Sequence, residues 1–410
     1  MEEQDISIAK SLFKEKKFQE TIEYCENLLS TDPSSKMALK LIAKSFLALN
    51  KKEKALYYYK KVLNIQNDDY EVLKDIGNIY QLKGYIKTAE EYYERAVFIK
   101  SDYAHALTNL GSIELRKGNN KKALSLIIKA TQSDPELTVA WIVKAKIYIQ
   151  LVNYQEAEKS CLKAIDLNPN LFGSYFLLAQ IFIGQKKLVK AEEYLRKTIE
   201  LKPDLYEANF NLGAILKEKG NKNEAEFFCR KAIHLKPNLI NVYFLLAEIL
   251  IDKSDFEEAC NTLDRVIQLK PDCSEAYYNK SCILQKQGEF IKAEESIRKA
   301  LQLNPDFACA HCNLGIILRD LGNLQEAELS IRKAIEIKPD YADAYLNLGG
   351  ILKDLGQLKE TEICIRKAIE INPNFAKAYF SLSLIKYSQE NKQWKDQLFS
   401  RNILINKSQK

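Results

Sequence analysis

The chain has 410 residues, of which 46% are hydrophobic and 28% are charged, and its formal net charge is +6. This composition can supply an extensive buried core, and the small net charge does not indicate a nucleic-acid or membrane partner. Nine cysteines, an odd number scattered without hairpin-like spacing, favour free thiols and a cytoplasmic setting over a disulfide framework. The acidic amino terminus lacks an apolar signal region, and the apolar runs are too short to span a bilayer, so no membrane association is expected.

The prolines reveal an internal repeat, because every interval between successive prolines is 34 residues or a multiple of 34. A period of this length is typical of arrays of helical repeats. Two points of the lattice lack a proline and hold Asn67 and Ser101, each followed by aspartate. The nine prolines are Pro33, Pro135, Pro169, Pro203, Pro237, Pro271, Pro305, Pro339 and Pro373.

With the proline at position 32, eleven tandem units are expected over residues 1–375, and residues 376–410 form a partial twelfth unit or capping helix with a polar tail. Within each unit we expect helix A up to position 15, a tight turn that is often glycine, and then helix B. Position 8 is always small, and position 20 is alanine in nine units. The first two units are the least regular, with Asp5 and Leu39 at position 4, where several later units carry an aromatic residue.

This pattern resembles the tetratricopeptide repeat (TPR), which is marked by an aromatic residue at position 4, Leu-Gly at 7–8, alanine at 20 and 27, and proline at 32. The unit at residues 342–375 matches at Tyr345, Leu348, Gly349, Ala368 and Pro373. The resemblance implies an all-α, right-handed superhelical solenoid of antiparallel helix pairs. It also implies a concave groove lined by positions 2, 5, 6, 9, 12 and 13 of helix A.

Asparagine recurs at position 6 of this expected groove. Its side chain competes for backbone hydrogen bonds within helices, so its recurrence there suggests a function. A carboxamide can both donate to and accept from a peptide bond, as in the similar asparagine ladder of the TPR region of O-linked N-acetylglucosamine transferase. The alternative is that these residues are relics of duplication that point into solvent. The asparagines are Asn109, Asn211, Asn279, Asn313 and Asn347.

Two further groups of groove residues are candidates for binding. Lys217, Arg319 and Lys353 at position 12 could favour acidic partner side chains. Units with Val143, Leu177 or Leu245 at position 6 could instead offer apolar pockets beside Phe176 and Phe244.

A second resemblance, to the carboxylate clamp of chaperone-tail-binding TPR domains, is partial. Lys74, Asn78 and Asn109 match three of its five positions, whereas Val139 and Val143 occupy the other two.

The segment Cys309-Ala-His-Cys312 raises the question of a zinc site or a redox dithiol. A zinc site would need a fourth ligand and a second paired motif, and a redox dithiol usually lies in a βαβ setting. In the repeat register His311 takes the aromatic position 4, so helix packing is the favoured interpretation, with metal and redox roles as alternatives. No metal or other cofactor is expected.

Arg-Lys pairs at positions 25–26 could form a basic stripe that follows a phosphate backbone. Each of these arginines, however, follows a glutamate by four residues, which favours pairing within the helix over nucleic-acid binding. The arginines are Arg196, Arg230, Arg298, Arg332 and Arg366.

The favoured function is that of a non-catalytic scaffold that binds extended or helical peptide segments in its groove, chiefly over repeats 7–11. The expected partners are proteins or peptides, and the pattern does not set an oligomeric state. The alternative is the substrate-recognition TPR region of a larger glycosyltransferase or sulfotransferase, because the NLGxILKDLG phrasing resembles arrays that precede such domains. No catalytic residues can be assembled in these 410 residues, so an enzyme is not expected.

Overall fold

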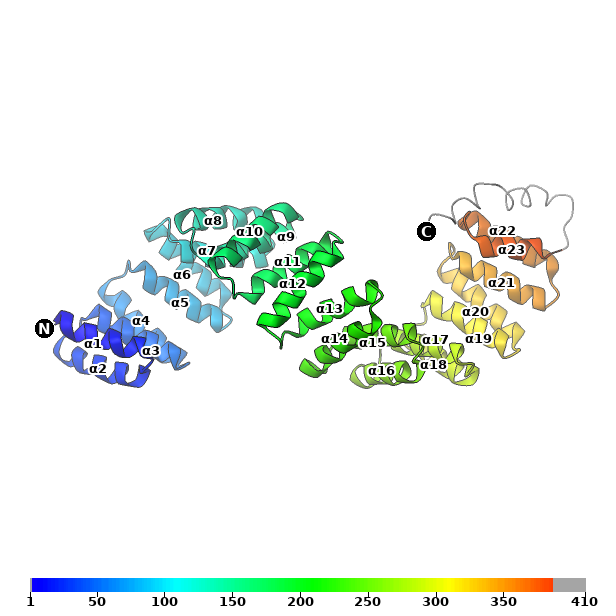
Figure 1. Ribbon diagram of the computed structural model, residues 1–410, viewed down its shortest axis with the longest axis horizontal. Helices are drawn as coiled ribbons and strands as arrows, with labels where there is room; N and C mark the ends of the chain where they lie inside the picture. The colour runs from blue at the N-terminus through cyan, green and yellow to red at the C-terminus, as the bar shows by residue number, and fades with distance from the viewer. Residues whose placement is uncertain (1, 386–410) are drawn as a thin grey trace. The chain divides into compact units, whose positions relative to one another are not determined.

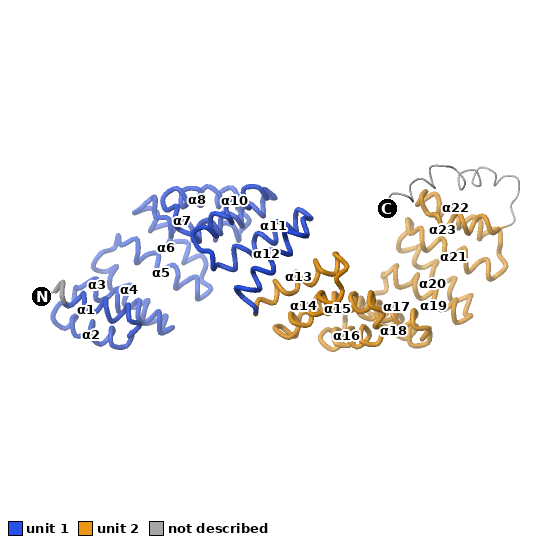
Figure 2. Tube along the Cα trace, in the orientation of Figure 1, with its two compact units in different colours: residues 1–203 blue, residues 204–410 orange. Residues whose placement is uncertain are grey.

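The computed structural model describes residues 2–385, and in this range the chain forms twenty-three helices and no strand (Figure 1). The expected all-α class is therefore confirmed. The chain divides into two compact units, unit 1 at Met1–Pro203 and unit 2 at Asp204–Lys410 (Figure 2). Each unit is a solenoid of helix pairs and is described by itself below.

Unit 1 contains six helix pairs, which are α1 (Glu2–Lys14), α2 (Phe18–Thr31), α3 (Lys36–Ala48), α4 (Lys52–Ile65), α5 (Tyr70–Leu82), α6 (Ile86–Ile99), α7 (Ala104–Arg116), α8 (Asn120–Ser133), α9 (Thr138–Gln150), α10 (Tyr154–Leu167), α11 (Phe172–Gly184) and α12 (Leu188–Leu201). The described part of unit 2 contains α13 (Tyr206–Glu218), α14 (Lys222–Leu235), α15 (Ile240–Asp252), α16 (Phe256–Leu269), α17 (Ser274–Lys286), α18 (Phe290–Leu303), α19 (Ala308–Asp320), α20 (Leu324–Ile337), α21 (Ala342–Asp354), α22 (Leu358–Ile371) and α23 (Ala376–Ser383).

The odd-numbered A helices from α1 to α21 have 13 residues each, and the even-numbered B helices have 14. Short turns make each A helix pack against the B helix that follows it. The B helix ends before a two-residue turn that carries the proline, whose ring cannot continue a helix. Within residues 2–385, no helix is both long enough and apolar enough to cross a membrane.

Close approach of helices A and B depends on the small residues at positions 8, 20 and 27. In the pair α19–α20, Ala327 and Ala334 are fully buried. A Cβ atom built on Gly315 would lie 2.3 Å from Cγ1 of Ile331 and 3.0 Å from the carbonyl oxygen of Ala327. The two helices are therefore closer at this point than any larger residue allows.

Replacement of Gly315 by valine should lower the free energy of unfolding by about 3 kcal/mol, because the added atoms force apart a contact that includes backbone. Chemical denaturation followed by circular dichroism would measure the loss. The matched control is Gly173→Val, since nothing lies within 4 Å of a Cβ atom there. Equal effects of the two substitutions would contradict the packing argument.

The turn between helices A and B needs a residue with a positive φ angle. Six repeats use glycine, such as Gly118 with φ +81°. Val152 takes the same place between α9 and α10 with φ +57°, although it is β-branched and 66% of its surface is exposed. The left-handed conformation crowds its Cβ atom, and the exposed side chain gains little burial in return.

Val152→Gly should therefore raise the free energy of unfolding by about 0.5–1 kcal/mol, because relief of the backbone strain exceeds the entropy cost of glycine. The converse substitution, Gly118→Val, should destabilise the chain by a similar amount. This loss would come from backbone strain alone, because no atom lies within 4 Å of a Cβ atom built at Gly118. Thermal unfolding of the two variants beside the parent chain measures both effects. A destabilised Val152→Gly variant would show that Val152 contributes contacts that outweigh the strain.

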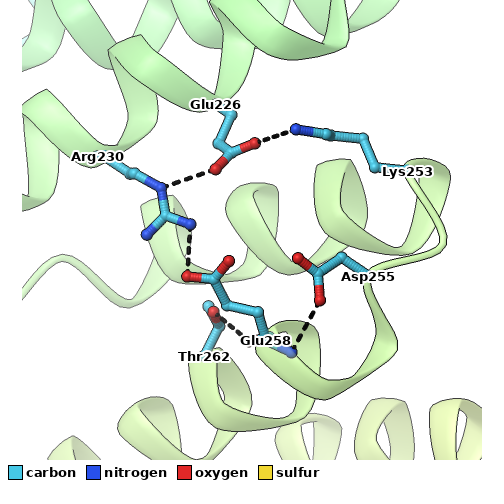
Figure 3. A network of polar contacts seen from close by, with 6 residues as sticks. All are labelled: Glu226, Arg230, Lys253, Asp255, Glu258 and Thr262. Carbon is cyan, nitrogen blue, oxygen red and sulfur yellow. Dashed lines mark hydrogen bonds and ion pairs between the residues drawn. The ribbon is translucent and has the colours of Figure 1, made fainter.

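The basic stripe on the B helices of unit 2 is paired with carboxylates. Arg230 Nε lies 2.9 Å from Glu226 of its own helix, and its Nη2 lies 2.5 Å from Glu258 of the next B helix (Figure 3). Lys253 binds the other oxygen of Glu226 at 2.6 Å. Such exposed pairs are worth at most a few tenths of a kcal/mol each. Their geometry nonetheless links successive repeats and neutralises the stripe.

The same double pairing recurs in two later repeats of unit 2. Arg298 binds Glu294 and Glu326, and Arg332 binds Glu328 and Glu360. Each arginine thus bridges its own B helix and the next one, as Arg230 does.

Of the predicted partial twelfth unit or capping segment at residues 376–410, the structure describes only residues 376–385. Helix α23 packs against α22 and starts at Ala376. Lys395 and the tail from Trp394, on which the prediction of a capping segment relied, lie outside the described residues.

Candidate functional site

The A helices form the inner layer of each unit. Successive A helices contact one another, as α7 and α9 do in unit 1 and α17, α19 and α21 do in unit 2. No comparable contact joins successive B helices in the described residues. The A layer is the more closely spaced of the two, so the array curves toward it. The side of the A helices that points away from the B helices is therefore the concave inner face.

The position-6 asparagines of units 1 and 2 lie half-buried on this inner face. Asn313 Nδ2 donates to Cys282 Sγ of the preceding repeat at 3.0 Å, and Asn347 Nδ2 donates to Cys312 Sγ at 3.4 Å. Each amide uses one N–H in this way and keeps its carbonyl oxygen and second N–H for another partner. Asn313 and Asn347 therefore join adjacent repeats.

Asn211 and Asn279 make no such contact within residues 2–385. Both are half-buried, and no hydrogen bond to either side chain occurs among the described residues. Glu248 stands at position 9 of the preceding repeat, as Cys282 does for Asn313, and its carboxylate binds Lys217. The complete amide of Asn279 is thus available beside the partly used amides of Asn313 and Asn347.

The three predicted cations differ in their partners. Lys217 is paired with Glu248, and Arg319 Nε lies 2.6 Å from Asp354 Oδ2. Lys353 is exposed and makes no ion pair within the described part of the chain. Only Lys353 therefore offers an uncompensated charge.

A cavity of about 210 Å³ brings several of these residues together between α19, α21 and α23. Its polar wall contains Arg319, Asn347 and Lys353, and Ser381 completes it. Gly350 makes room for the guanidinium, since a Cβ atom there would lie 3.0 Å from Arg319 Nη1. The apolar floor is formed by Leu346, Ile365, Leu384 and Ile385.

Sequence reasoning missed Gly350 and Ser381. A signal for Gly350 was present, because no other repeat has glycine at position 9. Ser381 gave no such signal, since it stands at position 6 of a unit whose helix A is only partly like the others.

The Cys309–Cys312 segment is surrounded by packing contacts. The Tyr341 hydroxyl hydrogen-bonds to both thiols, and Asn347 contacts Cys312. Burial raises the pKa of Cys312, so its thiol stays protonated at neutral pH. His311 Nε2 lies 2.9 Å from the carbonyl oxygen of Pro305.

Trp141 Nε1 donates to Pro135 O in the same way, so His311 acts as a position-4 packing residue. Among residues 2–385 no group of three or more His, Cys, Asp or Glu side chains is arranged to hold a metal.

The partial clamp in unit 1 is satisfied internally. Lys74 pairs with Asp75 at 2.5 Å. The Asn78 carbonyl oxygen accepts hydrogen bonds from Asn109 Nδ2 at 2.9 Å and from the Tyr93 hydroxyl at 2.8 Å. The structure therefore brings Asn78 and Asn109 together, but it directs their polar groups at each other and at neighbouring side chains.

Paired helices of constant length, small residues at their crossing points and an inner face of A helices define a tetratricopeptide repeat protein. Models of this repeat match residues 274–307, 308–341 and 342–375. The chain belongs to the family described as Cilia and flagella-associated protein 70 C-terminal domain, whose model matches residues 7–280.

Solved structures with a similar fold include YrrB, described as a TPR protein with an unusual peptide-binding site, and MamA. YrrB is 23% identical, with 47% of this chain and 100% of that chain covered and a TM-score of 0.38. MamA is 24% identical, with 42% and 94% covered and a TM-score of 0.37. No curated protein matches the chain.

Proposed function

We propose that the protein is a non-catalytic interaction scaffold that holds an extended segment of a partner protein on the inner face of unit 2. The observation that carries this proposal is the row of half-buried amides at one-repeat spacing, Asn279, Asn313 and Asn347. The row leads into the cavity that contains Lys353.

The spacing of the amides suits an extended backbone. Packed helices lie about 8–10 Å apart, so successive amides are separated by about that distance along the face. A polyproline II segment advances about 9 Å in three residues and then presents the same face again. One peptide group in three can therefore meet an asparagine in each repeat, whatever the partner's sequence.

The cavity adds a preference for an acidic side chain at one end of the segment. Lys353 supplies a free charge, and Arg319 is held beside it by Asp354. The apolar floor excludes water from one side of the pair, which strengthens the attraction of a carboxylate. A partner with an acidic residue next to a small apolar one fits this arrangement.

The alternative function, a substrate-recognition region within a larger glycosyltransferase or sulfotransferase, would place the same inner face ahead of a catalytic domain. Either way the binding is done by these residues, and we assign no catalytic step to them. The nine free cysteines and the protonated buried thiols suit the cytoplasm. The family description names cilia and flagella, so the cytoplasm of a ciliated or flagellated cell is the proposed setting.

Combined replacement of Asn279, Asn313 and Asn347 by alanine should weaken the binding of extended peptides by roughly 10- to 1,000-fold, because each lost hydrogen bond costs about 0.5–1.5 kcal/mol. Peptides selected by display on the intact chain would serve as probes, with affinities measured by fluorescence anisotropy. We expect acidic residues to be enriched at one position of the selected peptides.

The matched control is Asn261→Ala, which removes an exposed asparagine from helix α16 in the outer layer. Circular dichroism and thermal unfolding should show that the triple variant keeps its helices, although two inter-repeat contacts are lost. Undiminished affinity of a folded triple variant would disprove the role of the asparagines.

A further inference from the structure

Helices α9 and α11 of unit 1 have apolar residues on both sides. Their inward sides are buried among the repeats, with Ala145 and Ile147 of α9 and Leu178 and Ala179 of α11 at 2% exposure or less. Helices that are apolar all round are normally covered on all sides. The inner-face side of these two helices has no such cover within the described residues.

The uncovered residues form one continuous surface, the α9–α11 face. From α9 it contains Val139, which is 55% exposed, and half-buried Ile142 and Ile149. From α11 it contains half-buried Phe176 and Ile183. The spacings from 139 to 142, 142 to 149 and 176 to 183 place these side chains on one side of each helix, and α9 packs against α11.

Positive charge accompanies this apolar surface, and negative charge is missing from it. Neither α9 nor α11 contains an aspartate or glutamate. Lys146 is exposed between Ile142 and Ile149, and Arg116 is exposed at the end of the neighbouring α7. Neither cation makes an ion pair within residues 2–385.

The acidic residue of α7 does not change this balance. Glu114 is 1% exposed, and its carboxylate accepts from Asn119 at 2.7 Å and from Lys122 at 3.0 Å. Burial alone would raise the pKa of Glu114, but these hydrogen bonds outweigh it and lower the pKa to about 2. The charge of Glu114 is therefore buried and neutralised locally.

The α9–α11 face has no asparagine amides at position 6, and this determines whether an extended or a helical ligand suits it. Position 6 of these two repeats holds Val143 and Leu177, so no asparagine is present there to pair with an extended backbone. Unpaired backbone groups laid on an apolar surface would cost several kcal/mol. A ligand must therefore satisfy its own peptide groups, as an α-helix does.

We propose that the α9–α11 face binds an acidic amphipathic helix of a partner protein. Apolar side chains of that helix, spaced at i, i+3 or i+4 and i+7, cover Ile142, Ile149 and Phe176. Its flanking carboxylates meet Lys146 and Arg116. The site uses other residues than the amide row of unit 2 and stands or falls independently of it.

The test uses the full chain and a labelled synthetic helix of about 16 residues with a leucine stripe flanked by glutamates. One comparison peptide has the same composition in scrambled order, and a second has lysine in place of glutamate. We expect the acidic amphipathic helix to bind at least about tenfold more tightly than either, with affinity that falls as salt rises.

Two substitutions on the face should each weaken this binding by about tenfold. Lys146→Glu reverses the central charge, and Val139→Asp adds a charge at an exposed apolar position. The matched control is Lys129→Glu on the outer helix α8, which should leave the affinity unchanged. All three positions are exposed, and circular dichroism should show unchanged helicity.

Three results would overturn the proposal. The first is equal binding of the scrambled peptide, or equal affinity of the Lys146→Glu and parent chains. The second is a dimer, seen by light scattering, that Val139→Asp dissociates, because a second copy would then cover the face. The third is binding to phosphatidylserine vesicles that Lys146→Glu abolishes while peptide binding persists.

Discussion

The close crossing of helices A and B is the contact on which the rest of the structure depends. At position 8 the backbone of helix A comes so near to the side chain at position 24 that Gly315 leaves no room for a Cβ atom beside Ile331. Alanine at positions 20 and 27 keeps the same distance along the rest of the pair. Since the crossing is set by small residues and not by a particular large one, it can be repeated without change while other positions vary.

That freedom separates the residues that build the array from those that can bind. Positions 8, 20, 24 and 27 face the partner helix, whereas positions 5, 6, 9 and 12 face away from it. Unit 2 places amides and cations at the second set, with Asn313 and Asn347 also joining neighbouring repeats. Unit 1 places Ile142, Ile149 and Phe176 at the corresponding sites of α9 and α11. One scaffold thus carries two chemically different inner faces.

The helices and their crossings could be predicted from the sequence because they depend on local and repeated signals. Proline at position 32 and glycine at position 15 mark the ends of helices whatever lies around them. Which charged side chains pair with one another could not be predicted in this way. Lys74 lies beside Asp75 in the sequence, but that they pair depends on rotamers, and the link from Lys217 to Glu248 spans neighbouring repeats.

The strained turn at Val152 is another feature that a repeat pattern hides. A consensus expects glycine there, and only the backbone shows that valine adopts the same positive φ angle. The cavity beside Lys353 is similar, since it depends on the absence of a side chain at Gly350. Periodic signals reveal what all repeats share, whereas these sites arise where one repeat departs from the others.

Several arginines of the outer layer and two lysines of the inner layer differ in whether carboxylates pair with them. Arg230, Arg298 and Arg332 of the outer layer in unit 2 each pair with a glutamate of their own B helix and with one of the next B helix. Such pairs link neighbouring repeats and compensate the charge of these arginines, although each contributes little to stability. Lys146 and Lys353 have no such partners among the described residues, and both lie on the A helices. The inner layer thus combines these two cations with the apolar surface of α9 and α11 and with the free amide of Asn279.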